Sequence, residues 1–358
     1  MTGRADRLGA LAAERELDAL LVREPANLRW LTGFTGTNGL AVVGDGRHVF
    51  VTDFRYVERA ADEVGEGWER VEGRRDLLGD VAGALPDRRP LRLGFDDAHV
   101  SVRDHGRLAE ALGEEVSLVA AGGLVESLRA VKDARELAAV RAAAALADEA
   151  LSAALEGGLT GRTEREFALA LEDEMRRRGA QGPSFPSIVA AGPHGALPHA
   201  EPRDAGIPRD TLVVVDWGAR VDGYCSDGTR TFATGEIGDE AREVYEVVRR
   251  AQLAGLDAVR AGVPGRDADA AARAVVEEAG HGERFGHGLG HGVGLEVHEE
   301  PRLAKTAEDE LRAGSIVTVE PGIYLPGRFG VRIEDLVVVT ENAPEILSSH
   351  PKELTTVG

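Results

Sequence analysis

Apolar and polar positions alternate over short distances in the first third of the chain, as expected for strands interleaved with helices. The runs that predict strands are Ala19–Val22, Leu40–Val43, His48–Thr52, Leu91–Phe95 and Val116–Ala120. Apolar residues recur with helical spacing over Arg4–Leu20 and Val102–Leu112. This order predicts an α/β N-terminal domain of residues 1–122, ended by the turn-forming Ala121-Gly122-Gly123.

Residues 123–358 keep helices and strands in separate stretches, which predicts an α+β domain. Helical composition and spacing predict helices at Asp133–Leu155, Glu164–Arg178, Glu240–Arg260 and Arg266–Ala279. Thr163 and Glu166 have the spacing of a capping box, and Gly179 marks the end of the second helix. Runs rich in β-branched residues predict strands at Leu212–Val221, Gly223–Ala233, Ile316–Val319 and Val331–Val339.

Two aspartates are predicted to meet on one face of a β-hairpin. The Asp222-Gly223 pair favours a two-residue turn, which places Asp216 opposite Thr229. In the same register Asp227 lies opposite residue 218, so Asp216 and Asp227 become diagonal neighbours on one face. Two carboxylates placed in this way repel each other unless a positive charge lies between them. Acids that point into water give the same pattern, so the hairpin alone leaves a functional pair and a surface pair equally open.

A segment rich in glycine and histidine, Phe285–Glu299, contains His287, His291 and His298. The four-residue spacing of His287 and His291 is typical of a helical metal-binding pair, but the interleaved glycines argue against a helix. Extended backbone that closely approaches a ligand is the better interpretation. A single histidine usually has a structural role or lies on the surface, whereas three in such a segment indicate function.

Two further acids interrupt apolar β-rich runs. Glu320 follows Ser315–Val319, and Glu334 lies inside Val331–Leu336. Burying such a carboxylate is costly unless it is paired or bound to a metal. Arg332 shares a sheet face with Glu334, and its guanidinium can hold a coordinating carboxylate in place from behind.

The candidate ligands are four carboxylates and one imidazole: Asp216, Asp227, His291, Glu320 and Glu334. An oxygen-rich set with one nitrogen suits Mn²⁺, Co²⁺, Fe²⁺ or Zn²⁺. Five side chains exceed what one tetrahedral ion takes, and they suit two ions that share bridging carboxylates. Cys225 is the only cysteine, which excludes a disulfide within the chain and a cysteine-based zinc site.

The order and spacing of these five residues resemble the pita-bread metallopeptidases, a family that includes aminopeptidase P, prolidase and methionine aminopeptidase. The resemblance extends over the strips Asp216–Gly218, Ser226–Thr231, His287–Glu299, Glu320–Tyr324 and Val331–Asp335. The strip Asn27–Gly36 resembles the N-terminal domain of creatinase and the prolidases, which methionine aminopeptidase lacks. The resemblance therefore covers nearly the whole chain and implies the Xaa-Pro peptidase branch, with proline-containing dipeptides or oligopeptides as substrates.

Carried over onto this sequence, the resemblance implies that Asp216 chelates one metal and that Asp227 and Glu334 bridge two. His291 and Glu320 would complete the second metal's ligands. Two divalent ions per chain are implied, with Mn²⁺ preferred and Co²⁺ or Zn²⁺ as alternatives. The implied reaction is attack on the Xaa-Pro carbonyl by a water held between the ions.

The resemblance also implies which side chains act on the substrate. Glu320 would be the general base, and His199 would contact the reacting carbonyl or its oxyanion. His287 and His298 would line the proline side of the site and hold the substrate, with His298 counted among the catalytic residues. Aromatic side chains that wall the pocket or belong to the core are Tyr224, Tyr324 and Phe285.

Arg302 bears on the length of the substrate. A prolidase must recognise the free carboxylate of a dipeptide, and Pro301-Arg302 resembles the prolidase side of the family. The N-terminal strip also resembles aminopeptidases that act on longer peptides. A surface pair of Arg302 with Glu299 or Glu300 is the alternative to substrate binding.

Composition excludes some partners. The formal net charge of -20 disfavours nucleic acid and anionic membranes, which are themselves polyanionic. The first residues are charged and helix-prone and contain no apolar core of a signal peptide, so no secretion signal is expected. No apolar run is long enough to span a membrane, and a cytoplasmic enzyme is therefore expected. A homodimer is expected only from the family resemblance.

Two other functions are compatible with the same architecture. Creatinase shares it without metals, and some histone chaperones use the fold only to bind proteins. The intact set of five ligands argues against both.

Overall fold

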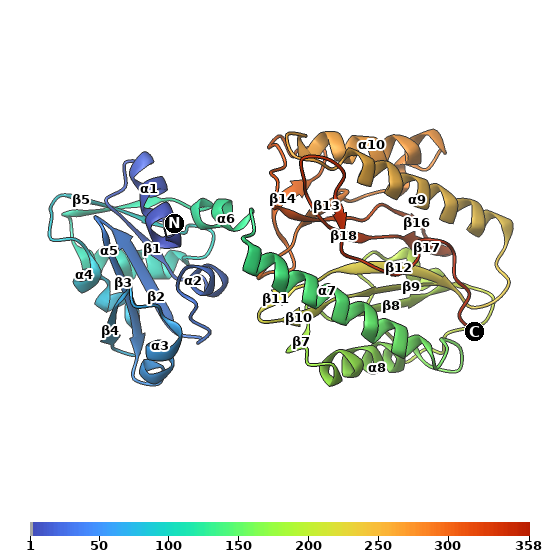
Figure 1. Cartoon of the computed structure of the whole chain (residues 1–358), viewed down its shortest axis with the longest axis horizontal. Helices are drawn as coiled ribbons and strands as arrows, with labels where there is room; N and C mark the ends of the chain where they lie inside the picture. Colours follow the sequence, from blue (N-terminus) through green and yellow to red (C-terminus); the bar gives the residue numbers. More distant parts are fainter. Residues whose placement is uncertain (1–2) are drawn as a thin grey trace. The chain divides into compact units, whose positions relative to one another are not determined.

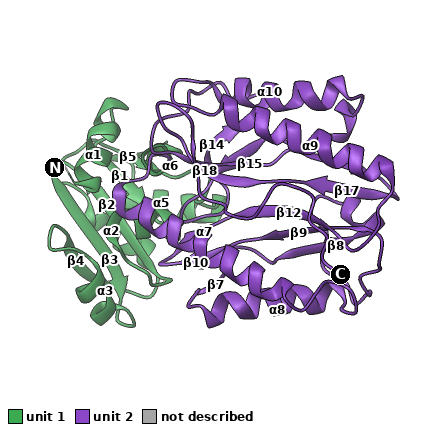
Figure 2. Ribbon diagram, turned by 45° about the vertical axis from the view of Figure 1, so that its right-hand side comes forward, with its two compact units in different colours: residues 1–129 green, residues 130–358 purple. Residues whose placement is uncertain are grey.

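The computed structural model describes residues 3–358, and the chain divides into one unit that ends at Arg129 and a second over residues 130–358 (Figures 1 and 2). The division follows helix α6 (Leu124–Arg129), whereas the turn-forming glycines predict a boundary after residue 122. Helix α6 stays with the first unit because Arg129 Nη1 donates to Asn27 Oδ1 at 2.6 Å and Asn27 Nδ2 donates to Glu126 Oε1 at 2.5 Å. The glycines mark a bend in the chain, and these hydrogen bonds connect helix α6 to the first unit.

The first unit is built on one mixed sheet of six strands in the order β4-β3-β2-β1-β5-β6. Its strands are β1 (Ala19–Val22), β2 (Gly39–Gly44), β3 (Arg47–Asp53), β4 (Glu69–Gly73), β5 (Leu91–Phe95) and β6 (Val116–Ala120). Its other helices are α1 (Arg4–Glu14), α2 (Pro25–Thr32), α3 (Val57–Glu63), α4 (Val81–Ala84) and α5 (Val102–Leu112), with a 3₁₀ turn η1 (Leu77–Asp80). Layers of helix and sheet around a buried core confirm the predicted α/β class.

The predicted helix Arg4–Leu20 is too long. Helix α1 ends at Glu14, and two residues later Glu16 adopts a positive φ of 57°. Leu17 then donates its backbone N–H to Ala12 O at 3.0 Å and enters the core. Leu17 continues the apolar spacing of the helix although it lies in the reversed chain, which explains the overextended prediction.

The second unit contains four long helices and short strands. The helices are α7 (Ala134–Leu155), α8 (Glu164–Arg177), α9 (Asp239–Ala258) and α10 (Gly265–Glu278), with 3₁₀ turns η2 (Gly192–Ala196) and η3 (Gly282–Arg284). The strands are β7 (Gly182–Pro183), β8 (Ile188–Ala191), β9 (Leu212–Trp217), β10 (Ala219–Val221), β11 (Tyr224–Cys225), β12 (Gly228–Ala233), β13 (Gly290–Gly292), β14 (Glu299–Leu303), β15 (Ile316–Val319), β16 (Gly322–Leu325), β17 (Phe329–Arg332), β18 (Asp335–Val338) and β19 (Glu345–Ile346). All four long helices occur where the sequence predicts them, and the capping box of Thr163 and Glu166 is present.

The strands of this unit lie between the two helix pairs (Figure 1). Helices α7 and α8 pack on the β12-β9-β8 sheet through a core that includes Leu151, Phe167 and Val215. Helices α9 and α10 pack on the β14-β13-β15-β18-β19 sheet through a core that includes Val248 and Val317. Two covered sheets confirm the predicted α+β class. No helix among residues 3–358 combines the length and apolarity needed to cross a bilayer.

Three predicted strands are interrupted at or close to an acidic residue. The run Val331–Val339 forms β17 and β18 with a break at Ile333-Glu334, so the prediction of one continuous strand is wrong. The break arises because Glu334 leaves its own ladder and donates its backbone N–H to Thr229 O at 3.0 Å. The hairpin of β9 to β12 is interrupted in the same way near Gly218 and Asp227. Strand periodicity contains no signal for such a tertiary contact.

Candidate metal centre

The predicted site residues surround one cavity of about 510 Å³ in the second unit. All five candidate ligands line it, as do His199, His287, His298, Arg302 and Arg332. These side chains come from segments that are far apart in the sequence. The fold therefore brings together the five predicted ligands, the three histidines and the two arginines for which the sequence predicts a role at the site.

The first hairpin supplies two carboxylates in the predicted register. Asp216 pairs with Thr229, and the turn residues Asp222 and Gly223 have the positive φ angles, 48° and 77°, that a tight hairpin turn requires. The pairs on either side of Asp227 follow one register, which confirms the predicted pairing of the strands. The ladder is open at Asp227 itself, so its carboxylate can turn into the cavity.

A second hairpin supplies two more acids at an equivalent interruption. Val319 pairs with Asp335, and Gly322 pairs with Arg332, in a common register. Glu320 and Glu334 occupy the open positions between these pairs. The bridge between Thr229 and Glu334 joins the two hairpins, so four carboxylates converge where two ladders are interrupted.

His291 adds the nitrogen donor from the glycine-rich segment. The segment is extended at β13, as the interleaved glycines predict. A Cβ on Gly290 or Gly292 would lie within 2.2 Å of a neighbouring backbone oxygen, so only glycine allows this close strand packing. His291 Nδ1 lies 3.1 Å from Gly292 O and must donate to it, because a carbonyl only accepts. The other ring nitrogen then faces Glu320 Oε1 at 3.2 Å and Asp227 Oδ2 at 3.7 Å.

The four carboxylates of the site are not balanced by enough nearby positive charge. Burial raises the pKa of Asp227 and Glu334 well above their ordinary values, and neighbouring carboxylates raise both further. Burial also raises the pKa of Asp216, although Arg332 opposes it. For Glu320 burial is the largest effect and acts in the same direction, but the contact with His291 and the nearby positive charge of Arg332 act against it, and the pKa is lowered to about 2.

These residues fit divalent cations. Asp227, His291 and Glu334 present ligand atoms within 4.8 Å of one another. Among residues 3–358, Asp216 Oδ1 and Glu334 Oε1 are buried without a hydrogen-bond partner. Buried polar atoms in proteins are nearly always bonded, so these oxygens and the inward nitrogen of His291 indicate a cation.

Arg332 supports the site from behind. Its Nη2 donates to Asp216 Oδ2 at 2.5 Å and its Nε donates to Thr229 Oγ1 at 3.0 Å. The carboxylate that it holds is therefore that of Asp216, although Glu334 is its sheet neighbour. Its Nη1 also donates to Tyr324 Oη at 2.9 Å, and the tyrosine hydroxyl is 2.9 Å from His287 Nε2.

His287 is already hydrogen-bonded at both ring nitrogens. Its Nδ1 contacts Gly288 O at 2.8 Å and must donate, so its Nε2 accepts from Tyr324. Burial lowers the pKa of His287 and raises that of Tyr324, which agrees with a neutral ring and a protonated phenol. With both nitrogens hydrogen-bonded, His287 can contact a substrate in this structure only through the face and edge of its ring.

The remaining predicted residues lie at the cavity wall. His298 packs against the ring of His291 with centroids 4.3 Å apart, and burial lowers its pKa. His199 lines the cavity together with its neighbours Pro198 and Ala200. Arg302 reaches the cavity, but about half of its side chain is exposed and its Nε lies 3.8 Å from Glu300 Oε1. Arg302 is therefore placed both to meet a substrate in the cavity and to pair with Glu300 at the surface.

Some residues around the site carry no clear signal in the sequence. Thr229 Oγ1 donates to Glu334 Oε2 at 2.7 Å, and Thr318 Oγ1 donates to Glu320 Oε1 at 3.1 Å. Both threonines occupy ordinary strand positions, and only their place two residues from an acid hints at a role. Phe185 lines the cavity and has no chemical signature.

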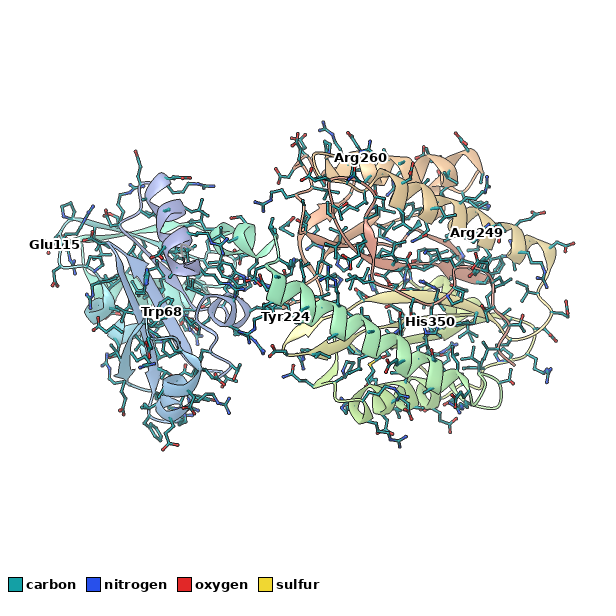
Figure 3. All side chains as sticks on the ribbon, in the orientation of Figure 1. Trp68, Glu115, Tyr224, Arg249, Arg260 and His350 are labelled. Atoms are coloured by element: carbon teal, nitrogen blue, oxygen red, sulfur yellow. The ribbon has the colours of Figure 1, made fainter. Side chains whose placement is uncertain are left out.

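The three aromatic residues divide between wall and core. Tyr324 lines the cavity, and Phe285 is buried beneath the guanidinium of Arg273. Tyr224 lies beside the start of α7 (Figure 3), where its hydroxyl donates to Glu136 Oε1 at 3.0 Å. Tyr324 is therefore the only one of the three that walls the cavity.

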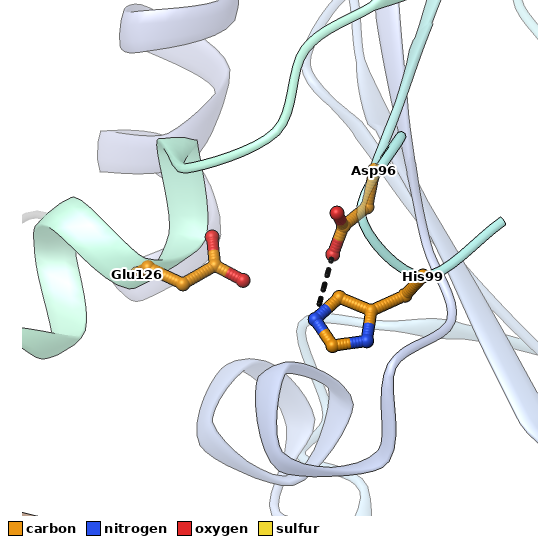
Figure 4. Close-up of side chains that lie close together, drawn as sticks. All are labelled: Asp96, His99 and Glu126. Atoms are coloured by element: carbon orange, nitrogen blue, oxygen red, sulfur yellow. Dashed lines mark ion pairs between the residues drawn. The ribbon is translucent and has the colours of Figure 1, made fainter. Parts of the chain in front are cut away.

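A second group of potential ligands lies in the first unit, where Asp96, His99 and Glu126 approach one another (Figure 4). His99 Nε2 is 3.9 Å from Asp96 Oδ2, and its side chain is 43% exposed. Both carboxylates already receive the amide of Asn27, at 3.4 Å for Asp96 and 2.5 Å for Glu126. The sequence gives no prediction for this group.

The chain matches two protein-family models. Residues 138–341 match metallopeptidase family M24, and residues 4–131 match the creatinase/prolidase N-terminal domain. The matches meet near the division between the two units. Together they cover the region that the sequence resemblance covers.

Individual relatives agree with this match over their full length. The chain is 33% identical to an Xaa-Pro dipeptidase of Pyrococcus furiosus, over 99% of this chain and 100% of the relative. Among solved structures, an Xaa-Pro dipeptidase from Bacillus anthracis is similar with a TM-score of 0.94 and 39% identity, over 99% of both chains. An X-Pro aminopeptidase from Thermotoga maritima is similar with a TM-score of 0.89 and 34% identity, over 99% of this chain and 100% of the other.

Proposed function

We propose that this chain, which belongs to metallopeptidase family M24, hydrolyses the peptide bond on the N-terminal side of proline and prefers Xaa-Pro dipeptides. The observation that carries the proposal is the convergence of four buried carboxylates and one imidazole on a cavity of about 510 Å³. The names of the relatives supply the proline specificity, and most of those described above are dipeptidases.

Asp216, Asp227, His291, Glu320 and Glu334 would hold two divalent ions, with Mn²⁺ as the preferred metal and Co²⁺ or Zn²⁺ as alternatives. Their oxygen-rich donor set and the unbonded buried oxygens support this assignment. When bound, the ions would acidify a water between them and polarise the scissile carbonyl. Asp227 and Glu334 would serve both ions, an assignment that the family resemblance implies and that the approach of their ligand atoms within 4.8 Å of each other and of His291 supports.

The chain's own residues would then supply the proton chemistry. Glu320 directly follows β15 and has one oxygen fixed by Thr318, so its carboxylate would be oriented to take a proton from the attacking water. His199 would donate to the carbonyl oxygen as it gains negative charge. Because an Xaa-Pro bond has no N–H, the site must recognise its substrate by carbonyl contacts and by shape. His287, His298 and Tyr324 would form the wall that receives the proline ring.

Arg302 supports the preference for dipeptides, since its guanidinium lies at the cavity wall, where a free substrate carboxylate can reach it. Cleavage of longer peptides is the second candidate, favoured by the similarity to the X-Pro aminopeptidase of Thermotoga maritima. A cytoplasmic location and a homodimeric state stay predictions.

The direct assay compares Ala-Pro with Ala-Pro-Ala, each with Mn²⁺, Co²⁺ and Zn²⁺ added separately to metal-stripped protein. We expect a higher kcat/KM for Ala-Pro and the best restoration by Mn²⁺ or Co²⁺. A higher kcat/KM for Ala-Pro-Ala would favour the aminopeptidase. Cleavage of neither peptide, with any of the three metals bound, would contradict Xaa-Pro hydrolysis.

A further inference from the structure

Residues 198–202, which include His199, line the cavity and belong to a longer segment between residues 191 and 203. It leaves β8, turns through η2 and then has no regular structure before β9. Leu197 is 57% exposed and His199 is also exposed, so apolar packing of their own side chains does little to hold these two residues in place. A side chain that must meet a reacting oxygen within a fraction of an ångström needs another means of support.

One buried carboxylate, that of Glu164 at the first position of α8, binds both ends of this segment. At the near end it accepts hydrogen bonds from Ala191 N at 3.0 Å and faces His194 Nδ1 at 2.9 Å. At the far end it accepts from the backbone N of Arg203 and from Nε and Nη2 of the same residue, each at 3.0 Å. Five contacts satisfy both oxygens of one carboxylate.

The surroundings of Glu164 keep it ionised. Burial raises the pKa of this carboxyl, but the hydrogen bonds from Arg203 and Ala191 outweigh burial and leave the pKa below its ordinary value. His194 must therefore donate from Nδ1, because an ionised carboxylate only accepts. The position at a helix N-terminus also favours negative charge. The same helix start binds the far end of the segment, since the backbone N–H groups of Glu164 and Arg165 donate to Ala205 O and Arg203 O at 3.1 Å.

A third contact fixes the middle of the segment to the metal centre. Arg332 Nη1 donates to Pro198 O at 3.2 Å, immediately before His199. His199 thus lies between a contact to the site on one side and the Glu164 contacts to Arg203 on the other. We propose that Glu164 is a positioning residue that sets the place of His199, an inference that rests on the role proposed above for His199.

The test is a double-mutant cycle on metal-loaded protein with Ala-Pro as substrate. Glu164→Gln keeps the volume of the side chain and removes its charge, and Arg203→Ala weakens the same contacts from a half-exposed position with less risk to folding. We expect each to lower kcat, by about 10- to 100-fold for Glu164→Gln, with little change in KM or in metal content. In a His199→Ala background the effect of Glu164→Gln should fall below about twofold, because the residue through which it acts is gone.

Glu166→Gln is the matched control, since Glu166 lies on the same helix turn and contacts the capping residue Thr163 instead of the His199 segment. It should leave kcat unchanged. Hydrogen exchange gives a readout that does not depend on the substrate: Glu164→Gln should accelerate exchange over residues 191–203 and Glu166→Gln should not. Unchanged exchange in that segment, or equal losses of kcat with and without His199, would overturn the inference. If the wild type fails to cleave Xaa-Pro peptides, the proposed function has failed, and the exchange result still decides whether Glu164 fixes the segment.

Discussion

The two units each bring carboxylates and histidine together, but only one group lacks the partners it needs. In the first unit the amide of Asn27 bridges Asp96 and Glu126, and His99 is exposed to water. In the second unit the acids are buried, and two of their oxygens have no hydrogen-bond partner among residues 3–358. Both groups bring carboxylates and histidine close together. Only in the second group are the carboxylates buried without enough hydrogen-bond or positively charged partners, and this difference identifies the candidate metal centre.

The largest effect is expected at Asp227 and Glu334, the carboxylates proposed to serve both ions. Asp227→Ala or Glu334→Ala removes a group that would serve both ions, so activity should fall by at least about 10²-fold and metal content should fall with it. Asp96→Ala and Glu126→Ala are the matched controls in the first unit and should leave both quantities unchanged. Steady-state kinetics with metal analysis of the same preparations measures this, and loss of activity in the controls would erase the contrast between the two groups.

Glu320→Gln should give the next largest effect. The substitution keeps the size of the side chain but removes its charge and its capacity to take a proton. We expect kcat to fall by at least about 10²-fold, the usual range for general base catalysis. The measurement needs a fully metallated variant, checked by metal analysis. A wild-type kcat in that variant would show that Glu320 only binds metal.

Much of this arrangement is predictable from local sequence. The Asp222-Gly223 turn and the alternation of the flanking strands fix the register that pairs Asp216 with Thr229. The glycines around His291 disfavour a helix because glycine loses more backbone freedom in a helix than other residues do. Turn chemistry and the backbone preferences of glycine depend on a few consecutive residues, so a sequence displays them directly.

What escapes prediction depends on contacts between distant segments. The break at Glu334 follows from its bridge to Thr229, more than 100 residues away in the chain. The choice of Asp216 as the partner of Arg332 follows from the way the two hairpins meet. Glu164 sits in a capping-box sequence whose only local signal is helix initiation. The spacing of apolar residues shows which face of each helix or strand is buried, but it does not show which of these faces pack against each other.

Arg302 sharpens the comparison on the substrate side, because it is an exposed cation beside a buried acidic centre. A charge-assisted hydrogen bond contributes about 1.5–3 kcal/mol, so Arg302→Ala should raise KM for Xaa-Pro dipeptides by about 10- to 150-fold while sparing tripeptides. Parallel kinetics on Ala-Pro and Ala-Pro-Ala test this. Equal effects on both substrates, or no effect on either, would assign Arg302 to its pair with Glu300.

The smallest effect concerns the pH dependence of metal-free stability. The pKa values of Asp227 and Glu334 are raised in the folded state, so these groups stabilise it below their unfolded pKa and lose that contribution as pH rises through the folded pKa. A tenfold difference in proton affinity between the folded and unfolded states corresponds to about 1.4 kcal/mol of stability. Metal-free wild type should therefore lose stability from pH 5 to pH 8 relative to Asp227→Asn, measured by denaturant unfolding. Identical pH profiles for the two proteins would contradict the crowding of charge at this site.

The metal requirement is the central claim, and a titration of metal-stripped wild-type protein with Mn²⁺ tests it most directly. Turnover of Ala-Pro should be absent at the start, should rise with added metal and should level off at about two ions per chain, counted by metal analysis of the same samples. Full turnover in the stripped protein, or activity that does not follow bound metal, would contradict the account.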